Sequence, residues 1–346
     1  MAGLQIKDEY IKFIRKDILD LADQLKVVHQ VAGLYWHADP VGTPLIYSKI
    51  DLVKCTGGKV SCILPPYQDF PSVFLKVYFY DRGYQFETAG LKAAAEMTPV
   101  EGVRVPKVLA SYPDLRAVVL EHRLWQDTSS AWKRLWVNRL GVDWFKVGRW
   151  LRAFHDSQVS LKRNEVFLQH KFKKYESHLN TLKHLFTPEQ VEKMERIRQT
   201  ARDYFDQHEV EWVISHGDFG LDNIKKSDFT LEIIDFEDCQ PAPREFDFLN
   251  CFTRLDYLQR LPRGRHHQQE ITDDFRSGYG PMPPHSAATD FLHLYIKLDL
   301  LETYFRRGNA EGYSWLQKAI FKLFFRGSLS RVKEFLDSTN TNLIQT

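Results

Sequence analysis

The spacing of hydrophobic positions changes along the chain, and each spacing predicts a different kind of element. Between residues 4 and 29 apolar side chains recur every three or four positions, which predicts an amphipathic helix. Over 46–124, short apolar runs predict five strands, with one short helix at 86–97 after the third strand. From about residue 143 onward helical spacing dominates.

The strand-rich stretch contains one clear turn signal. Thr56-Gly57-Gly58 separates two apolar runs, which is typical of a hairpin. This order of elements predicts a small β-rich domain with one inserted helix. The predicted strands are 46–55, 59–64, 72–80, 104–112 and 116–124.

Capping residues locate the helices of the second part. Asp143 is expected to cap a helix over 144–157. Thr187-Pro188-Glu189-Gln190 combines a cap, a proline at the first helical position and a capping-box glutamine, and predicts a helix through Tyr204. Two late helices are predicted at 290–305 and 314–336.

The chain is therefore predicted to be an α+β protein of three segments. A helical extension over 1–45 precedes a β-rich domain over 46–124, and a mainly helical domain follows over 125–346. The helical domain contains two short apolar runs, at 212–214 and 231–234, which we expect to pair as a hairpin.

Composition narrows the classes of function. With 47 basic and 45 acidic residues, the formal net charge of +2 gives no general attraction to nucleic acid or to an anionic membrane. The four cysteines form no CxxC pair, so we expect free thiols and no structural zinc site. The N-terminus lacks the apolar core of a signal peptide, and no apolar run approaches the roughly 18 residues that span a bilayer. We expect a cytoplasmic protein without nucleic-acid or membrane partners, and the sequence does not indicate its oligomeric state.

Polar residues gather where the two short apolar runs end. His216-Gly217-Asp218 follows the first run, with Asn223 five positions after Asp218, and Asp235-Phe236-Glu237 follows the second. Such residues also cap ordinary turns. Phosphoryl transfer, however, needs a carboxylate for the attacking hydroxyl, an amide oxygen and a second carboxylate for magnesium, and a lysine for the phosphates. A hairpin would bring Asp218, Asn223 and Asp235 around one point.

These motifs resemble those of the aminoglycoside phosphotransferase and choline kinase family. Residues 216–223, HGDFGLDN, are similar to its catalytic loop, and 234–237, IDFE, to its metal motif without a following glycine. Phe246-Asp247-Phe248-Leu249 resembles the site of a further aspartate. The resemblance implies a protein-kinase-like bilobal α+β fold, with a β-rich N-lobe and a mainly helical C-lobe. It also implies transfer of the γ-phosphate of ATP to a hydroxyl group of a small molecule.

The resemblance extends into the β-rich part. It implies that Lys76 binds the ATP phosphates, that Glu87 pairs with Lys76, and that the backbone of Glu121 and Arg123 binds adenine. Residues 150–155 resemble the helix that precedes the catalytic loop. Two features depart from the pattern: Gly57-Gly58 is not a G-x-G-x-x-G loop, and the hinge lacks the glycine that often follows it.

Plainer explanations remain for each residue. Lys76 could face water from an edge strand, Glu87 could lie on an exposed helix face, and Gly57-Gly58 could be only a turn. His216 is expected to brace the loop rather than to react, and Asp247 to hold the catalytic loop rather than to touch substrate. Glu237 is a minor candidate for an extra metal contact.

A second group of charges lies further along the chain. The basic group 260–267 carries Arg260, Arg263 and Arg265, and the acids Glu270, Asp273 and Asp274 follow it. A solvated surface explains both groups best, although contact with an anionic or a cationic part of a substrate stays open.

Together these features favour a small-molecule kinase. Asp218 is expected to act as the catalytic base, Asn223 and Asp235 to hold magnesium (Mg2+), and Lys76 to contact the phosphates of ATP. The sequence does not decide whether the acceptor is an antibiotic, a sugar or nucleoside, an amino alcohol or a homoserine-like metabolite. It also does not decide between ATP and GTP as the phosphate donor. The alternative is a nucleotide-binding pseudoenzyme or regulatory scaffold on the same fold. A protein kinase is disfavoured because only twelve positions separate Asp235 from Asp247, which leaves no room for an activation segment.

Overall fold

The computed structural model describes most of the chain after residue 50. The expected helix over 4–29 and the expected join near 124–130 lie outside the described residues, as do Gly57, Gly58 and Arg123. No helix in the described ranges is long and apolar enough to cross a membrane. Those ranges are 51–56, 59–64, 73–78, 80–122, 142–158, 161–226, 230–256, 264–310 and 314–339.

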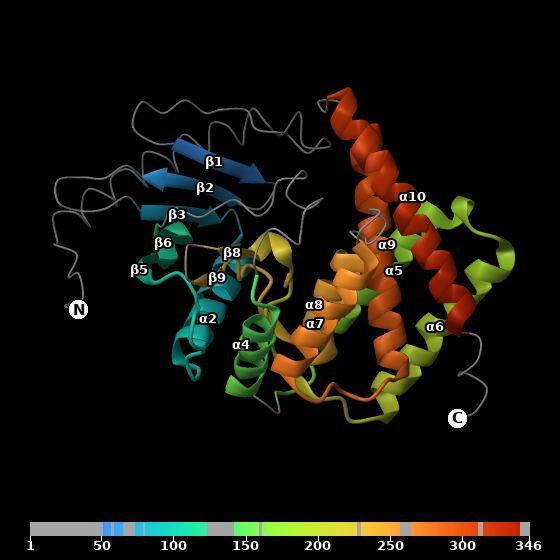
Figure 1. The fold of residues 1–346 in the computed structure, drawn as a ribbon, viewed down its shortest axis with the longest axis horizontal. Coiled ribbons are helices and arrows are strands. Elements are labelled where there is room, and N and C mark those ends of the chain that lie inside the picture. Colours follow the sequence, from blue (N-terminus) through green and yellow to red (C-terminus); the bar gives the residue numbers. More distant parts are fainter. Residues whose placement is uncertain are drawn as a thin grey trace.

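An antiparallel sheet of five strands forms the β-rich part, in the order β1-β2-β3-β6-β5 (Figure 1). The five strands predicted from the sequence are confirmed, and so is the helix after the third strand, which begins earlier than expected, at Asp81. The elements are β1 (Asp51–Thr56), β2 (Lys59–Leu64), β3 (Val73–Tyr78), α2 (Asp81–Glu96), β5 (Val108–Tyr112), the short 3-10 helix η1 (Pro113–Leu115) and β6 (Ala117–Glu121).

The register of the first three strands places two lysines on one face of the sheet. Thr56 pairs with Lys59, so only two residues connect β1 to β2. Lys59 pairs with Tyr78, and Ser61 pairs with Lys76. Paired residues and alternate residues along a strand share a face, so all four of these β2 and β3 side chains point the same way. The opposite face of β3 is also buried, because Val73, Leu75 and Val77 are part of the core.

The two short apolar runs form strands but do not pair with each other. The first, β7 (Trp212–Ser215), pairs with β10 (Gln240–Pro243). The second, β9 (Leu231–Ile233), pairs with β8 (Ile224–Lys226) and, in parallel, with β4 (Val103–Arg104). The expected hairpin is therefore wrong. The true partners carry Lys-Lys and Pro-x-Pro, so hydrophobic alternation does not mark them as strands.

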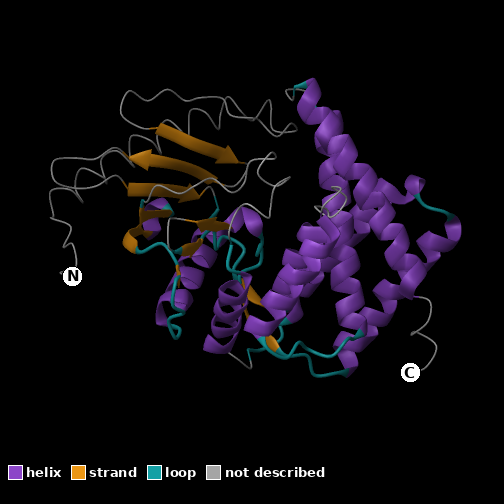
Figure 2. Cartoon of the chain, viewed as in Figure 1, coloured by secondary structure: helices purple, strands orange, loops and turns teal. Residues whose placement is uncertain are grey.

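Helices make up the second part of the molecule, on the far side of β8 and β9 from the five-stranded sheet (Figures 1 and 2). The predicted caps are confirmed: Asp143 accepts from the Lys146 amide, and Thr187 forms a capping box with Gln190. The helices are α4 (Trp144–Ser157), α5 (Glu165–Leu182), α6 (Pro188–Gln207), α7 (Glu245–Asp256), α8 (Gly264–Tyr279), α9 (Ala287–Asn309) and α10 (Trp315–Ser338), with the 3-10 turns η3 (Lys183–Leu185) and η4 (Leu221–Asn223).

A cluster of aromatic rings joins α4 to the segment between β7 and β10. Trp150 lies 5.1 Å from Phe154 and 6.0 Å from Phe219, measured between ring centroids, and Phe154 lies 5.8 Å from Phe236. All four side chains are fully buried. The polar motifs at 216–223 and 235–238 are therefore anchored by neighbouring phenylalanines, which fix their position relative to the helical core.

Helices α4 and α8 approach closely through two glycines. A Cβ atom on Gly148 would lie 2.2 Å from the carbonyl oxygen of Phe275, and one on Gly278 would lie 2.0 Å from that of Phe145. Neither position has room for a side chain, so the close crossing depends on both glycines.

Candidate active site

Asp218 lies in the loop that follows β7, held by residues on both sides of it. Asn223 donates its side-chain amide to the backbone carbonyl of Asp218 (2.8 Å) and to the Asp218 carboxylate (3.1 Å). Gly217 has φ +84°, and a Cβ atom there would lie 2.1 Å from the carbonyl oxygen of Asp238. Only glycine fits this position, so the loop conformation that presents Asp218 is set by the residue before it.

The buried carboxylate of Asp247 holds the start of this loop. It accepts the backbone N–H groups of His216 (2.7 Å) and Gly217 (2.9 Å), and its third contact is to Nε2 of His155 (3.0 Å). Burial alone would raise the pKa of Asp247, but the hydrogen bonds from His155 and the loop outweigh it and lower that pKa. His216 in turn donates from Nε2 to the carbonyl of Ile234 (3.0 Å), which ties the loop to the end of β9.

Arg254 of α7 makes an ion pair with the Asp218 carboxylate. Its Nε donates to Asn250 (3.1 Å), and its Cδ lies 3.2 Å from where a Cβ atom of Gly220 would be. The guanidinium stem therefore fills the space above Gly220. Sequence reasoning did not find Arg254, because 36 positions separate it from Asp218 and no local motif links them.

Asp235 lies at the meeting point of the sheet and the helical part. It has φ +70°, a left-handed conformation that is uncommon for a residue other than glycine. Lys76 contacts Asp235 (3.0 Å) and Glu87 of α2 (2.6 Å), and the Lys76 side chain is only 5% exposed. Because β3 lies between β2 and β6, Lys76 is not on an edge strand, and the alternative of a lysine facing water is wrong.

Close packing of α2 brings Glu87 to Lys76. A Cβ atom on Gly90 would lie 2.8 Å from Cβ of Phe236 and from Sγ of Cys239. The absence of a side chain at Gly90 thus lets α2 rest directly on the segment that contains Asp235. Glu87 is fully buried, so its carboxylate depends on the Lys76 ammonium for compensation.

Lys59, on β2, is a further charged residue at this point. It makes ion pairs with Asp235 and with Glu237 (2.9 Å), and its side chain is 5% exposed. Burial alone would lower the pKa of Lys59, but the two carboxylates outweigh it and raise that pKa. Burial and the neighbouring Asp235 raise the pKa of Glu237, whereas the ammonium groups of Lys76 and Lys59 outweigh burial and hold the pKa of Asp235 far below its usual range.

Lys59 was missed at the sequence level, although a signal was present. The residue directly follows Gly57-Gly58 and stands two positions before Ser61 on an alternating strand.

A cleft of about 330 Å³ brings the three expected residues of the helical part together. Asp218, Asn223 and Asp235 all line it, and α9 and α10 supply the opposite wall. The other wall residues are Leu221, Asp222, Glu237, Arg254, Leu255, Asp299, Leu300, Thr303, Tyr304, Arg307 and Phe324. Sequence motifs do not predict the α9 and α10 wall, because its residues follow the pattern of ordinary amphipathic helices.

The donor atoms in the cleft suit a magnesium ion. The side-chain nitrogen of Asn223 donates to Asp218, so its side-chain carbonyl oxygen can face a cation. Lys59 and Lys76 both contact Oδ1 of Asp235, so Oδ2 can face the same cation. Magnesium prefers hard oxygen ligands and is often held by one or two protein carboxylates, with water and phosphate completing its shell. Among the described residues, no cluster of three or more His, Cys, Asp or Glu side chains could hold a metal ion.

The expected adenine contacts are described only in part. Glu121 ends β6, and its backbone N–H donates to the carbonyl of Lys107 (2.9 Å), so only the Glu121 carbonyl could take part in base recognition. Arg123 lies outside the described residues. Glu270, Asp273 and Asp274 are exposed on α8, and none of them lines the cleft, while Arg260 and Arg263 are not described.

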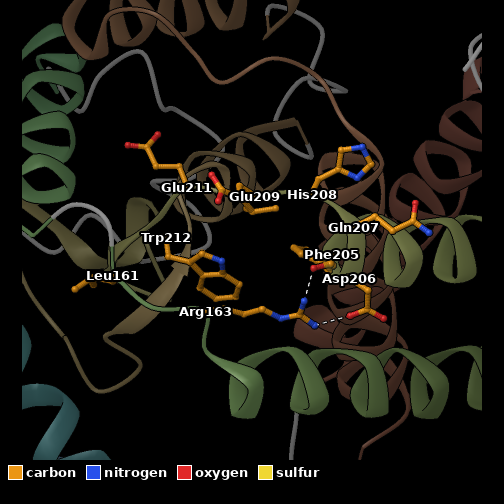
Figure 3. A pocket seen from close by; sticks show the side chains of 10 residues that line it. Leu161, Arg163, Phe205, Asp206, Gln207, His208, Glu209, Glu211 and Trp212 are labelled. Atoms are coloured by element: carbon orange, nitrogen blue, oxygen red, sulfur yellow. Dashed lines mark hydrogen bonds and ion pairs between the residues drawn. The ribbon is translucent and has the colours of Figure 1, made fainter.

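A larger hollow of about 720 Å³ lies elsewhere, at the end of α6 and the start of β7 (Figure 3). Arg163 extends along it and bonds to the Phe205 carbonyl and to Asp206 (2.8 Å). None of the residues predicted for the site lines this hollow. The smaller cleft, and not this one, contains the chemistry that the sequence motifs indicate.

Comparisons with known proteins agree with this geometry. The sequence profile of the phosphotransferase enzyme family matches residues 72–284. No curated protein matches the sequence significantly.

Three solved structures have a similar fold. A choline/ethanolamine kinase family protein from Mesorhizobium loti has a TM-score of 0.54 at 14% identity, over 83% of this chain and 88% of that one. Amicoumacin kinase hAmiN, solved with AMP-PNP, Ca2+ and Ami, has a TM-score of 0.54 at 14% identity, over 94% and 96%. An aminoglycoside 2'-phosphotransferase in its GDP complex has a TM-score of 0.53 at 9% identity, over 91% and 99%. At these identities the likeness shows the fold, so the predicted protein-kinase-like α+β architecture is confirmed.

Proposed function

The chain belongs to the phosphotransferase enzyme family, and from this premise we propose that it transfers the terminal phosphate of ATP to a hydroxyl group of a small molecule. The observation that supports the proposal most is the convergence of Asp218, Asn223 and Asp235 on one cleft, with Lys76 bonded to Asp235. Each of these residue types has a place in phosphoryl transfer, which depends mainly on positioning and on neutralising charge.

Each side chain has a distinct task in this proposal. Asp218 orients the acceptor hydroxyl and takes its proton, and Asn223 keeps the Asp218 carboxylate in place. Asn223 and Asp235 are the residues that would hold magnesium, which when bound neutralises charge on the phosphates. Lys76 contacts the phosphates, and Glu87 holds the lysine in position. His216 and Asp247 support the loop without contacting the reactants.

Resting contacts show what must change when substrates bind. Asp218 is paired with Arg254, so an acceptor hydroxyl must share the carboxylate with the guanidinium or displace it. Asp235 is paired with two lysines through one oxygen, so a cation would compete with them for the carboxylate. A cation on Asp235 would exchange one charged contact for another, whereas a neutral hydroxyl on Asp218 would replace an ion pair with a charge-assisted hydrogen bond.

The acceptor is proposed only as a class. The similar structures include an amicoumacin kinase and a choline/ethanolamine kinase family protein, so antibiotics and amino alcohols are the first compounds to test. One similar structure holds AMP-PNP and another holds GDP, so both ATP and GTP belong in the assay. A place in antibiotic resistance and a location in the cytoplasm are parts of the same proposal.

The test is a nucleotide-consumption screen with hydroxyl compounds as acceptors. ATP or GTP consumption in the presence of magnesium is measured with antibiotics, amino alcohols, sugars and nucleosides, and mass spectrometry locates the new phosphate. Asp218→Ala should abolish transfer while MgATP still raises the melting temperature, and Asp203→Ala on the exposed face of α6 is the matched control. Nucleotide binding without transfer to any acceptor would instead indicate a pseudoenzyme. Near-native turnover of Asp218→Ala would show that Asp218 is not the base.

A further inference from the structure

A line of buried polar side chains connects Asp247 with the surface of the helical part. His155 contacts Asp247 through Nε2 (3.0 Å) and the hydroxyl of Tyr279 through Nδ1 (2.8 Å). That hydroxyl also accepts a longer bond from Nη1 of Arg244 (3.4 Å). His155, Asp247 and Tyr279 are at most 1% exposed, and the Arg244 side chain is 4% exposed. Their polar atoms therefore bond to one another in place of water.

Arg244 forms the outer end of the line. This residue lies between β10 and α7, and its Nε and Nη2 donate to Glu211 (2.8 and 2.7 Å). Nη2 also donates to Asp156 of α4 (2.8 Å). Glu211 is 52% exposed and Asp156 is 40% exposed, so the line ends at the surface. A bidentate pair holds the planar guanidinium in one orientation, which leaves Nη1 to face Tyr279.

Helix packing brings Tyr279 to His155. Tyr279 is the last residue of α8, and α8 crosses α4 so closely that a Cβ atom on Gly148 would lie 2.9 Å from the backbone nitrogen of Tyr279. The tyrosine ring stacks on Phe275 (5.9 Å between centroids) and meets the His155 ring edge-on (5.8 Å). These ring contacts do not need the hydroxyl, so a phenylalanine at this position can test the hydroxyl by itself.

The donors and acceptors along the line fix where each hydrogen lies. A guanidinium only donates, so the Tyr279 oxygen accepts from Arg244 and directs its own hydrogen to His155. Burial raises the pKa of Tyr279 to about 12, so this hydrogen is present at neutral pH. With Nδ1 as the acceptor, the His155 ring carries its hydrogen on Nε2 and donates it to Asp247. The opposite tautomer would place the lone pair of Nε2 against the carboxylate.

The carboxylate that receives this bond also holds the loop. Oδ2 of Asp247, which contacts His155, accepts the backbone N–H of His216 (2.7 Å), and Oδ1 accepts that of Gly217 (2.9 Å). Asp218 is the next residue along the chain. The orientation of the His155 ring therefore affects the position of Asp218 through a single carboxylate.

We propose that Tyr279 is a positioning residue for phosphate transfer. Its hydroxyl keeps His155 in the tautomer that donates to Asp247, and this bond keeps the loop that contains Asp218 in place. Arg244 in turn orients the hydroxyl. The inference rests on the proposed function of the cleft, and it adds two residues that touch neither nucleotide nor acceptor, since neither of them lines the cleft.

Steady-state kinetics of Tyr279→Phe test this role, with MgATP and an acceptor found in the screen. The kcat should fall about 10-fold, the rate equivalent of one lost hydrogen bond between neutral groups, while the KM for ATP stays within about twofold of the wild type. Tyr175→Phe is the matched control, because it removes another buried hydroxyl, which donates to the carbonyl of Met194 (2.9 Å). This control should lose stability in urea unfolding to a similar extent but keep the wild-type kcat.

Two further measurements follow the line itself. Because Arg244 acts through the hydroxyl, Arg244→Met should lower kcat by less than Tyr279→Phe does, and should cause no additional loss in the double variant. Nitrogen NMR of the histidine side chains determines the tautomer directly, with the His155 signals identified by their loss in His155→Gln. We expect a hydrogen on Nε2 and none on Nδ1 in the wild type.

Four results would each overturn the inference while leaving the proposed function standing. These are an unchanged kcat in Tyr279→Phe, an equal fall of kcat in Tyr175→Phe, additive losses in the double variant, and a hydrogen on Nδ1 of His155 in the wild type. If circular dichroism shows that Tyr279→Phe does not fold, the kcat of Arg244→Met and the tautomer of His155 still decide. If the wild-type protein phosphorylates no acceptor, the proposed function fails and the role of Tyr279 fails with it.

Discussion

Replacing Asp247 by Asn tests how strongly the loop that contains Asp218 depends on one buried carboxylate. Asp247 accepts two backbone N–H groups of the loop and contacts His155. All three partners donate hydrogen bonds to the carboxylate, and each of its two oxygens accepts at least one of them. An asparagine has only one acceptor oxygen, so its NH2 group would face a donor in either orientation. At least one charge-assisted hydrogen bond is therefore lost. The Gly217 N–H keeps Ser215 Oγ (3.1 Å) as an acceptor, but the buried NH2 group of the asparagine is left without one.

The size of the effect follows from these losses. A hydrogen bond to a charged group contributes about 1.5–3 kcal/mol, and an unsatisfied buried donor costs a further ~1–3 kcal/mol. We expect the free energy of unfolding to fall by about 3 kcal/mol, which corresponds to a drop in Tm of ~4 °C for a chain of this size. Because Gly217 adjoins Asp218, a shift of the loop by about 1 Å should lower kcat about 100-fold. The nucleotide contacts at Lys76 and Asp235 remain, so the KM for ATP should stay nearly constant.

Urea unfolding and steady-state kinetics measure the two effects separately, with Asp203→Asn on the surface of α6 as the control. The pH dependence gives a second check. The pKa of Asp247 is lowered in the folded protein, so the stability it contributes is present above about pH 4 and is lost as the pH falls further. The difference between wild type and Asp247→Asn should therefore shrink in acid. A variant that loses stability but keeps its kcat would refute the argument that Asp247 positions the loop.

Three further predictions concern other contacts of the helical part. Burial raises the pKa of Glu245 to about 7, so the folded protein holds a proton that the unfolded chain releases. The free energy of unfolding should therefore fall by on the order of 3 kcal/mol as the pH rises from about 4.5 to 7. Glu245→Gln should flatten this dependence in urea unfolding at pH 5 and pH 8; an unchanged slope would contradict the assignment. Arg254→Met should lower kcat about 10- to 100-fold, because the Asp218 carboxylate would keep only Asn223 of the two side chains that orient it. Nucleotide affinity should change little, and a raised KM for ATP alone would contradict the prediction. Gly148→Ala should destabilise the protein by about 2 kcal/mol, because overpacking against the Phe275 backbone outweighs the gain in helix propensity. A variant as stable as the wild type, or more stable, would show that α4 and α8 can move apart without an energetic cost.

Much of the architecture could be predicted from the sequence, because it depends on local signals. Alternation and turn residues located the five strands, and the caps at Asp143 and Thr187 located two helices. The contact of Lys76 with Glu87 was expected from the family resemblance. Asp218 and Asp235 do lie together, as the resemblance implies, although the hairpin expected to join their strands does not form.

What could not be predicted depends on contacts between distant segments. The partner of β7 is a strand with two prolines, which no strand pattern indicates. Arg254 reaches Asp218 only because α7 packs over the loop, and Lys59 reaches Asp235 only because β2 and β3 share a register. The α9 and α10 wall of the cleft is set by helix packing, which hydrophobic spacing alone does not orient.

The close approach at Gly90 determines when the Lys76–Glu87 pair is assembled. With no side chain between them, α2 rests on Phe236 and Cys239, both fully buried. Moving α2 outward would expose that apolar surface, at about 25 cal/mol per Å², and would strand Glu87 without its lysine. The Lys76–Glu87 pair is therefore completed by folding, before any nucleotide arrives. The rate of the proposed phosphate transfer would therefore depend on the concentrations of the protein and its substrates, rather than on a movement of α2.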